Sequence, residues 1–205
     1  MRESASLSDR VDPQQPLPPR KVGRPASKDQ MQGQDMRQVL YRKFGSDLTA
    51  IEGIGVTTAL VVLTEVGPDL NAFKTEKHFC SWLGLCPDKR ISGGKVLSSR
   101  TRKVINRVSE ALRMAAVTLE RSQSALGGYY RRMKGRLGAA EAITATAHKL
   151  ARLIYRLIKH GEAYVRQGLE AYEIQFRERR LHNLRKAARH FGFNLIAQQV
   201  PTPVS

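Results

Sequence analysis

Apolar residues recur at helical spacing along most of the chain, and this pattern predicts an all-helical protein. Helices are expected over residues 35–44, 75–83, 99–122, 139–160 and 169–190. The apolar stripe of 139–160 is the strongest, and Gly161 after it is a natural C-cap. Gly127 and Gly128 are expected to break the chain between 99–122 and a short basic element that starts at Tyr129. The sequence therefore predicts a helical bundle.

Residues 47–66 resemble a helix-hairpin-helix, in which a short helix, a glycine hairpin and a second helix follow one another. Gly53 and Gly55 expose backbone N–H groups at the start of the second helix, where the dipole favours an anion. Gly53, Gly55 and Thr57 are therefore candidate DNA-phosphate positions. In the alternative interpretation the two glycines only make a tight turn between packed helices, with Ile54 in the core.

The two ends of the chain differ in composition from this central part. Residues 1–34 carry five of the nine prolines and little apolar periodicity, which predicts a disordered arm or linker. Within it, 21–25 resembles the core of an AT-hook, and an ordinary basic linker explains the same letters. We expect a helical domain over 35–161, a basic helix over 162–196 and a frayed tail over 197–205.

The net charge of the chain indicates which classes of molecule it binds. The chain has 35 Lys and Arg residues against 18 Asp and Glu, a formal charge of +17. This excess indicates nucleic acid or an anionic surface, with salt-sensitive binding. No apolar run reaches the length of a membrane span and no signal peptide is recognisable, so a cytosolic protein is expected. Cys80 and Cys86 fit neither a zinc site nor a disulfide framework and are expected to be small buried residues.

Residues 81–107 combine a lone serine with a glycine pair and a strong positive charge. Ser92 precedes Gly93, Gly94 and Lys95. Between positions 88 and 107 a single anion, Asp88, stands against seven cations, which are Lys89, Arg90, Lys95, Arg100, Arg102, Lys103 and Arg107. A hydroxyl on a glycine-rich turn can approach a phosphate, and nearby cations offset the charge that develops as phosphorus is attacked. The alternative is a solvated loop followed by a helix that Ser98 or Ser99 caps.

A second basic feature lies on the helix expected over 139–160. Lys149, Arg152, Arg156 and Lys159 are spaced three, four and three residues apart and form one ridge. Like charges at this spacing repel each other, which favours a phosphate-binding ridge. The alternative is an ordinary solvated face. Lys149, Arg152 and Arg156 join the candidate DNA-binding residues.

Several short motifs occur in a fixed order. They are Asp47-Leu48-Thr49-Ala50-Ile51-Glu52-Gly53-Ile54-Gly55, Phe79-Cys80-Ser81-Trp82-Leu83-Gly84-Leu85-Cys86-Pro87, Ile91-Ser92-Gly93-Gly94-Lys95, Ala111-Leu112-Arg113, Leu126-Gly127 with Tyr130-Arg131-Arg132, and Ala142-Ile143-Thr144-Ala145 with Ala147-His148-Lys149-Leu150-Ala151-Arg152. Together, over about residues 36–196, they resemble the C-terminal domain of the insertion-sequence transposases of the 110/116/902 group.

The resemblance implies a bacterial, cytoplasmic, nucleoid-associated recombinase that excises and inserts a DNA element. Characterised relatives are guided by an RNA from the element and act as assemblies, so DNA, a guide RNA and a second copy of the chain are the implied partners. The family pairs an N-terminal RNase H-like domain, whose four acidic residues bind magnesium, with a C-terminal domain whose serine forms a phosphoserine link to DNA. By its place in the motif Ser92 corresponds to that serine, with Ser98 and Ser99 close by.

The sequence departs from the family in its acidic residues. Residues 1–34 are too few for the N-terminal domain, and Asp47, Glu52, Glu65 and Asp69 are interpreted as caps and solvated side chains. We therefore expect no cofactor in this chain, with magnesium confined to the absent domain. The expected protein is a truncated transposase that binds DNA but cannot recombine it alone. The alternatives are a non-catalytic nucleic-acid-binding regulator of the full-length transposase and a helical structural protein.

Overall fold

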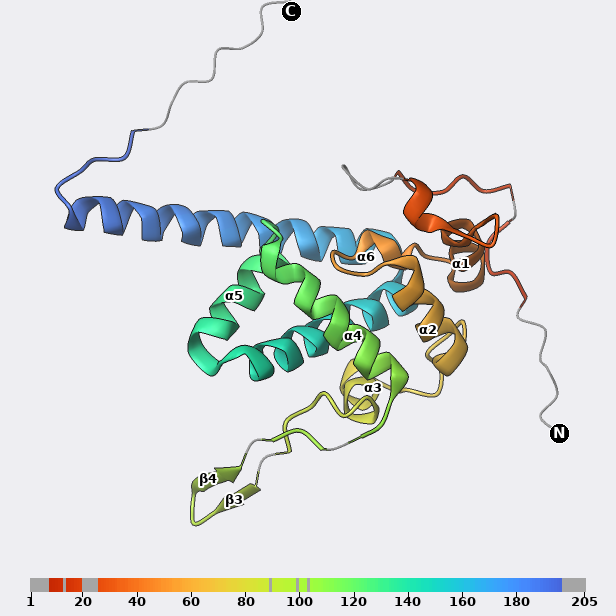
Figure 1. Ribbon diagram of the computed structural model, residues 1–205, viewed down its shortest axis with the longest axis horizontal. Coiled ribbons are helices and arrows are strands. Elements are labelled where there is room, and N and C mark those ends of the chain that lie inside the picture. Colours follow the sequence, from red (N-terminus) through yellow and green to blue (C-terminus); the bar gives the residue numbers. More distant parts are fainter. Residues whose placement is uncertain are drawn as a thin grey trace, which may run out of the picture. The chain divides into compact units, whose positions relative to one another are not determined.

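The computed structural model describes residues 8–12, 14–19, 26–88, 90–98, 100–102 and 104–196. The chain divides into two compact units, Met1–Gln167 and Gly168–Ser205. The described part of the first unit consists mostly of helices, with two short hairpins (Figure 1). The predicted all-helical class is therefore confirmed.

The first predicted helix is present with its expected ends. α1 covers Met36–Phe44 and begins at Asp35, whose carboxylate accepts hydrogen bonds from the backbone N–H of Arg37 and Gln38. It ends at Gly45, which adopts a φ of 74° and donates its N–H to the Tyr41 carbonyl. An acidic N-cap and a left-handed glycine C-cap satisfy backbone groups that the helix leaves unpaired at its two ends.

The segment predicted to be a helix-hairpin-helix contains a 3-10 turn, η2, over Leu48–Ala50 and an α-helix, α2, over Val56–Val66. Asp47 caps η2, and Gly53 lies in the turn between the two elements with a φ of 83°. Ile54 is buried, as both interpretations of this segment required. In place of the first helix of a helix-hairpin-helix, this segment has only the 3-10 turn η2. The helix-hairpin-helix therefore stays a prediction.

The helix predicted over 99–122 starts later than expected. α3 covers Glu76–Trp82, close to the predicted 75–83, whereas α4 covers Arg107–Thr118 and is followed by a 3-10 turn, η3, over Leu119–Arg121. The cap of α4 is Asn106, whose side-chain oxygen accepts from the Ser109 N–H at 3.1 Å. Ser98 lies in a strand instead, so its predicted capping role is wrong, and Ser99 lies outside the described residues.

The glycine pair at 127–128 does not break a helix. α5 covers Ala125–Leu137, so both glycines lie in its first turn, and Ser124 caps it by accepting from the Gly127 N–H. A Cβ on Gly127 would lie 2.2 Å from the Ser122 carbonyl oxygen, because the helix starts tightly against the turn before it. The pair therefore allows close packing, and the prediction of a break there is wrong.

The last long helical stretch is interrupted once. α6 covers Ala139–His190, and Gly161 inside it has non-helical angles, φ 81° and ψ 175°. The segment before Gly161 matches the helix predicted over 139–160, and the segment after it contains the helix predicted over 169–190 but starts before residue 169. The boundary between the two compact units follows shortly after, between Gln167 and Gly168.

The core of the first unit lies among its helices. α2 packs against both α1 and α4. The buried apolar residues of α4 and α6 include Val108, Leu112, Ala147, Leu150 and Ile154. On α3 and its surroundings Phe73, Phe79, Trp82 and Tyr155 form an aromatic cluster, and the Tyr155 hydroxyl donates to the Phe73 carbonyl at 3.0 Å. This cluster joins α3 to α6 within the unit.

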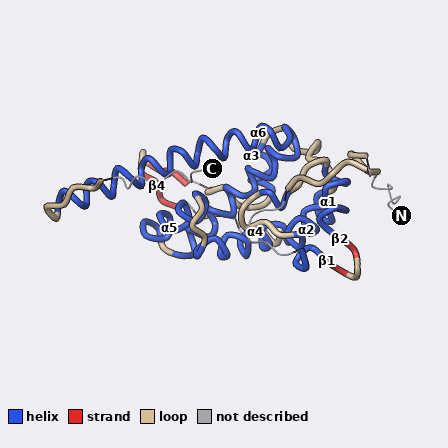
Figure 2. The backbone as a smooth tube through the Cα atoms, turned by 90° about the horizontal axis from the view of Figure 1, so that it is seen from above, coloured by secondary structure: helices blue, strands red, loops and turns tan. Residues whose placement is uncertain are grey.

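The N-terminal arm has more structure than its composition predicted. A 3-10 turn, η1, covers Ala26–Asp29, and strands β1 (Gln30–Met31) and β2 (Gln34–Asp35) form a hairpin beside α1 (Figure 2). The Arg10 N–H donates to the Arg42 carbonyl at 2.8 Å, and the Arg37 guanidinium donates to the Pro18 carbonyl at 2.7 Å. These hydrogen bonds connect the described residues of the arm to α1. Residues 21–25 and 197–205 lie outside the described residues.

One further property concerns membranes. None of the helices in the described residues is both long enough and apolar enough to cross a bilayer.

Candidate nucleic-acid interface

Ser92 lies at the tip of a β-hairpin rather than on an irregular loop. Strand β3 (Arg90–Ser92) pairs antiparallel with β4 (Lys95–Ser98), and Ser92 is the direct partner of Lys95. Gly93 and Gly94 form the two-residue turn with φ values of 54° and 75°. Two successive positive φ angles favour glycine, because other side chains clash there. The predicted glycine turn beside Ser92 is present. The two strands that flank this turn were not predicted from the sequence.

The tip of this hairpin is open. Ser92 and Lys95 are both exposed, and a Cβ on Gly93 or Gly94 would meet no atom within 4 Å. Directly opposite residues in an antiparallel pair have Cβ atoms about 4.5–5.5 Å apart on one face. The Ser92 hydroxyl and the Lys95 ammonium can therefore reach the same phosphate group.

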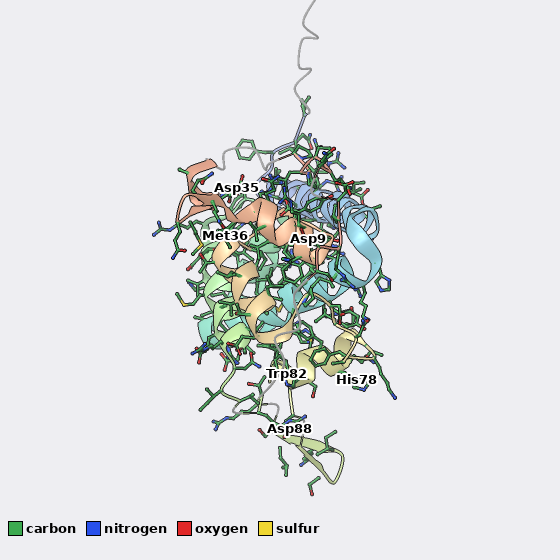
Figure 3. All side chains as sticks on the ribbon, turned by 90° about the vertical axis from the view of Figure 1, so that its right-hand side faces the viewer. Asp9, Asp35, Met36, His78, Trp82 and Asp88 are labelled. Carbon is green, nitrogen blue, oxygen red and sulfur yellow. The ribbon has the colours of Figure 1, made fainter. Side chains whose placement is uncertain are left out.

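The base of the hairpin is fixed to the region around α3. The Asp88 N–H donates to the Arg100 carbonyl at 2.9 Å, and Pro87 and Thr101 form an isolated antiparallel bridge. Arg102 donates to the Ser81 hydroxyl at 3.1 Å. Asp88 lies between Trp82 of α3 and the hairpin (Figure 3). These contacts hold the base of the hairpin in place, so the tip extends from a fixed position.

The cations predicted between residues 88 and 107 differ in exposure and in the groups that they contact. Lys95 and Arg100 are exposed, Arg102 contacts Ser81, and Arg107 forms an ion pair with Glu65 at 3.3 Å. An exposed pair of this kind contributes little, about 0–1 kcal/mol, so Arg107 keeps most of its freedom to meet a phosphate. Lys89 and Lys103 lie outside the described residues, and Arg90 is placed only by its backbone in β3.

The three candidate residues near α2 separate into two kinds. A Cβ on Gly53 would lie 3.1 Å from the Leu119 side chain and 3.2 Å from the Ala115 carbonyl oxygen. Gly53 thus allows the turn to pack closely on α4, as the tight-turn interpretation required. Gly55 is the N-cap of α2 and makes no side-chain cap, while Thr57 is exposed in the first turn. These two positions remain predictions as phosphate contacts.

The predicted basic ridge of α6 is partly neutralised by one acidic residue, Glu76 of α3. Arg152 donates to Glu76 Oε1 at 2.6 and 2.9 Å, and Arg156 donates to Oε2 at 2.7 Å and to Oε1 at 3.1 Å. Partial burial by itself would raise the pKa of Glu76, but the hydrogen bonds and charges of the two arginines lower it below its ordinary value. One carboxylate therefore relieves the repulsion expected along the ridge.

The outer members of the ridge also have partners. Lys159 donates to the Asn71 side-chain oxygen at 2.7 Å, and the Lys149 ammonium lies 4.5 Å from the centre of the Tyr129 ring. Sequence reasoning missed Glu76, because 76 residues separate it from Arg152. The only local signal was an acidic residue in the first turn of a helix.

A small pocket lies beside these ion pairs. It has a volume of about 210 Å³ and is lined by Glu76, Lys77, His148 and Arg152. Burial, and secondly the charge of Arg152, lower the pKa of His148. Cys80 is buried, which confirms its prediction and raises the pKa of its thiol to about 12, whereas Cys86 is only half-buried.

We expect His148 to make the stability of the protein pH-dependent. Because the folded pKa lies below the ordinary 6.5, the unfolded chain takes up this proton first as the pH falls. The contribution is complete above pH 6.5 and is lost as the pH falls through 6.5 toward the folded pKa, by at most about 1.4 kcal/mol per pH unit.

Urea unfolding at a series of pH values measures this contribution. His148→Gln is expected to flatten the curve between about pH 7 and pH 5. Replacement of the exposed His78 by Gln is the matched control and is expected to keep the wild-type slope. A wild-type slope in His148→Gln would show that other groups carry the pH dependence.

Comparison with known proteins shows that the segment carrying the hairpin is similar to a known family. Residues 45–131 match the model of the Transposase IS116/IS110/IS902 family. This segment, called the transposase segment below, is similar to that family. The transposase segment contains α2, α3, the β3–β4 hairpin and α4, and therefore Ser92, whereas Arg152 and Arg156 lie beyond it.

Two curated relatives of the transposase segment come from bacteria. The insertion element IS110 uncharacterized 43.6 kDa protein of Streptomyces coelicolor is 29% identical over 119 residues, which are 57% of this chain and 29% of that protein. The putative transposase y4pF/y4sB of Sinorhizobium fredii is 33% identical over 127 residues, 57% of this chain and 32% of that protein. The chain thus spans about a third of the length of these relatives. No solved structure matches it.

Proposed function

We propose that this chain is the DNA-binding part of a transposase that mobilises an insertion sequence, and that Ser92 supplies the nucleophile. The supporting observation is the position of Ser92, which is exposed at the tip of a glycine hairpin within the transposase segment and lies opposite Lys95. The name of the Sinorhizobium fredii relative, a putative transposase, agrees with this proposal.

The proposed reaction is a transesterification at phosphorus. The Ser92 oxygen forms a bond to a backbone phosphorus as one phosphorus–oxygen bond to a neighbouring deoxyribose breaks. The hydroxyl proton passes to solvent, and the leaving oxygen takes up a proton. The number of phosphodiester bonds is conserved, so the step needs no external energy source. Lys95 offsets the negative charge that develops on the phosphoryl oxygens, an effect that contributes about 2–4 kcal/mol at comparable sites.

Binding of the DNA backbone is assigned to the exposed cations around the hairpin. Lys95, Arg100 and Arg107 lie on the stretch that carries Ser92, and Gly55 and Thr57 at the start of α2 offer backbone N–H groups to a further phosphate. Arg152 and Arg156 supply guanidinium groups whose positions Glu76 holds. The other proposed partners are an RNA from the element and further copies of this chain.

The magnesium site that the family resemblance implies does not fit the described residues. No three His, Cys, Asp or Glu side chains among them come together as a metal-binding group. Asp47 and Glu65 are instead paired with Arg37 and Arg107. In the proposal, a separate acidic domain carries the magnesium.

A denaturing-gel assay for covalent protein–DNA adducts tests the nucleophile. The chain is incubated with the end sequences of its own element and magnesium, alone and with the acidic domain of a full-length relative. We expect an adduct that Ser92→Ala abolishes and the control Ser98→Ala retains. An adduct that persists in Ser92→Ala contradicts the assignment. Salt-sensitive DNA binding without any adduct indicates the non-catalytic regulator instead.

A further inference from the structure

The β3–β4 hairpin exposes two large apolar side chains that its own strands do not cover. Ile91 is 61% exposed and Leu97 is 69% exposed. Leu97 has no opposite residue, because Arg90 pairs with Ser98 and Ile91 pairs with Val96. The extra residue is a β-bulge, a feature that bends a strand and redirects side chains near functional sites. An isolated two-stranded hairpin is marginal in water, so a surface that covers these residues would also stabilise it.

The β3–β4 hairpin, a two-stranded ribbon, has a size that suits the major groove of DNA. Its strands have three and four residues. Strands lie about 4.8 Å apart and rise about 3.3 Å per residue, so the ribbon is about 10–13 Å long. The major groove of DNA is about 12 Å wide and 8.5 Å deep, and it admits a two-stranded ribbon. The ribbon can thus reach the floor of the groove.

Charge decides between DNA and another copy of this chain as the occupant. Seven cations and one anion lie between residues 88 and 107, and the whole chain carries a formal charge of +17. A second copy would bring the same cations against this hairpin, and like charges in contact repel. The phosphate rims of a groove attract them instead, and the floor of the groove offers apolar surface in the methyl group of thymine.

We infer that the β3–β4 ribbon enters the major groove and places Ile91 and Leu97 against base edges, with thymine methyl groups as their preferred contacts. The inference rests on the proposed DNA-binding function and adds to it a contact that depends on the bases. The depth at which the hairpin sits in the groove then fixes where Ser92 and Lys95, at its tip, meet the DNA backbone. The cations hold the ribbon in the groove, and the apolar pair sets where along the DNA it rests.

Fluorescence anisotropy with two 30-base-pair duplexes tests this inference. One duplex is alternating A·T and the other carries deoxyuridine in place of every thymidine, which removes only the methyl groups. The wild-type chain is expected to bind the thymidine duplex about threefold to tenfold more tightly. The double variant Ile91→Ser, Leu97→Ser removes both apolar side chains and leaves no methyl group to meet thymine, so it is expected to bind both duplexes equally.

The dependence of affinity on salt separates the two kinds of contact. The double variant is expected to keep the wild-type slope of log affinity against log salt. Lys95→Gln is expected to reduce the slope by about 0.9, the value for one lost phosphate contact, and to keep the preference for thymidine. Met114→Gln on α4 changes an apolar residue of matching exposure, 68%, and is expected to alter neither quantity.

Three results would overturn the inference. They are equal wild-type binding to both duplexes, an equal loss of preference in Met114→Gln, and a dimer in sedimentation that the double variant dissociates, which would make the apolar pair a protein contact. Salt-insensitive or absent binding to both duplexes would instead remove the proposed DNA-binding function, and this inference with it. Circular dichroism and the urea midpoint of each variant confirm that the fold is retained.

Discussion

Asp47→Ala is expected to lower the free energy of unfolding by about 3–5 kcal/mol. Arg37 and Asp47 form a buried ion pair, with side chains only 4% and 3% exposed. The guanidinium donates to Asp47 Oδ2 at 2.6 and 3.0 Å, and Oδ1 accepts from the N–H and hydroxyl of Thr49. Removal of the carboxylate leaves a charged guanidinium away from water and removes the cap of η2.

Urea unfolding of Asp47→Ala and of the control Asp9→Ala measures this effect. Asp9 pairs with Lys43 at 2.8 Å, and its side chain is 35% exposed. A partly exposed pair contributes only about 0–1 kcal/mol, so the two variants should differ clearly. The double variant Arg37→Met, Asp47→Ala should regain part of the loss, because no buried charge remains. Equal losses in Asp47→Ala and Asp9→Ala would show that burial of the pair has no energetic consequence.

Gly127→Ala is expected to destabilise the protein by about 3 kcal/mol, although alanine is the better helix former. The new Cβ would lie 2.2 Å from the Ser122 carbonyl oxygen and 2.8 Å from that of Leu119. Both are backbone atoms, and Arg131 also donates to the Ser122 carbonyl at 2.6 Å. The turn therefore cannot yield without losing other contacts, and the start of α5 must move.

Gly135 on the same helix supplies the matched control. A Cβ there would meet no atom within 4 Å, so Gly135→Ala is expected to raise the stability by about 0.5–1 kcal/mol. The two substitutions are chemically identical and should have opposite signs in thermal or urea unfolding. A stabilising effect of Gly127→Ala would contradict the close packing of α5 against its preceding turn.

The helices were predictable from the sequence because their signals are local. Asp35 and Gly45 flank the nine residues of α1, and Gly161 marks the interruption of α6. The β3–β4 hairpin was missed because its strands are short and basic residues hide their alternation, although Gly93-Gly94 between two short runs is a hairpin signal. The glycines at 127–128 looked like a break, since only the folded turn reveals the close approach.

The candidate site likewise has parts that were predictable from neighbouring residues and parts that depend on contacts between distant helices. Ser92, its glycines and Lys95 are adjacent in the sequence, so their association was predictable from the residues and the family resemblance. The role of Glu76 was not, because it depends on α3 and α6 meeting in space, where one carboxylate holds Arg152 and Arg156. Likewise, Asp47 was expected to be a solvated cap, and its buried partner Arg37 comes from a different helix.

The aromatic cluster on α3 has a spectroscopic consequence. Trp82 is the single tryptophan of the sequence, is 42% exposed, and lies 5.4 Å from Phe73 between ring centres. The neighbouring residue, Ser81, accepts the hydrogen bond from Arg102 that ties down the base of the hairpin. Intrinsic tryptophan emission thus arises from one indole beside the hairpin anchor, and it reports on that region without an attached label.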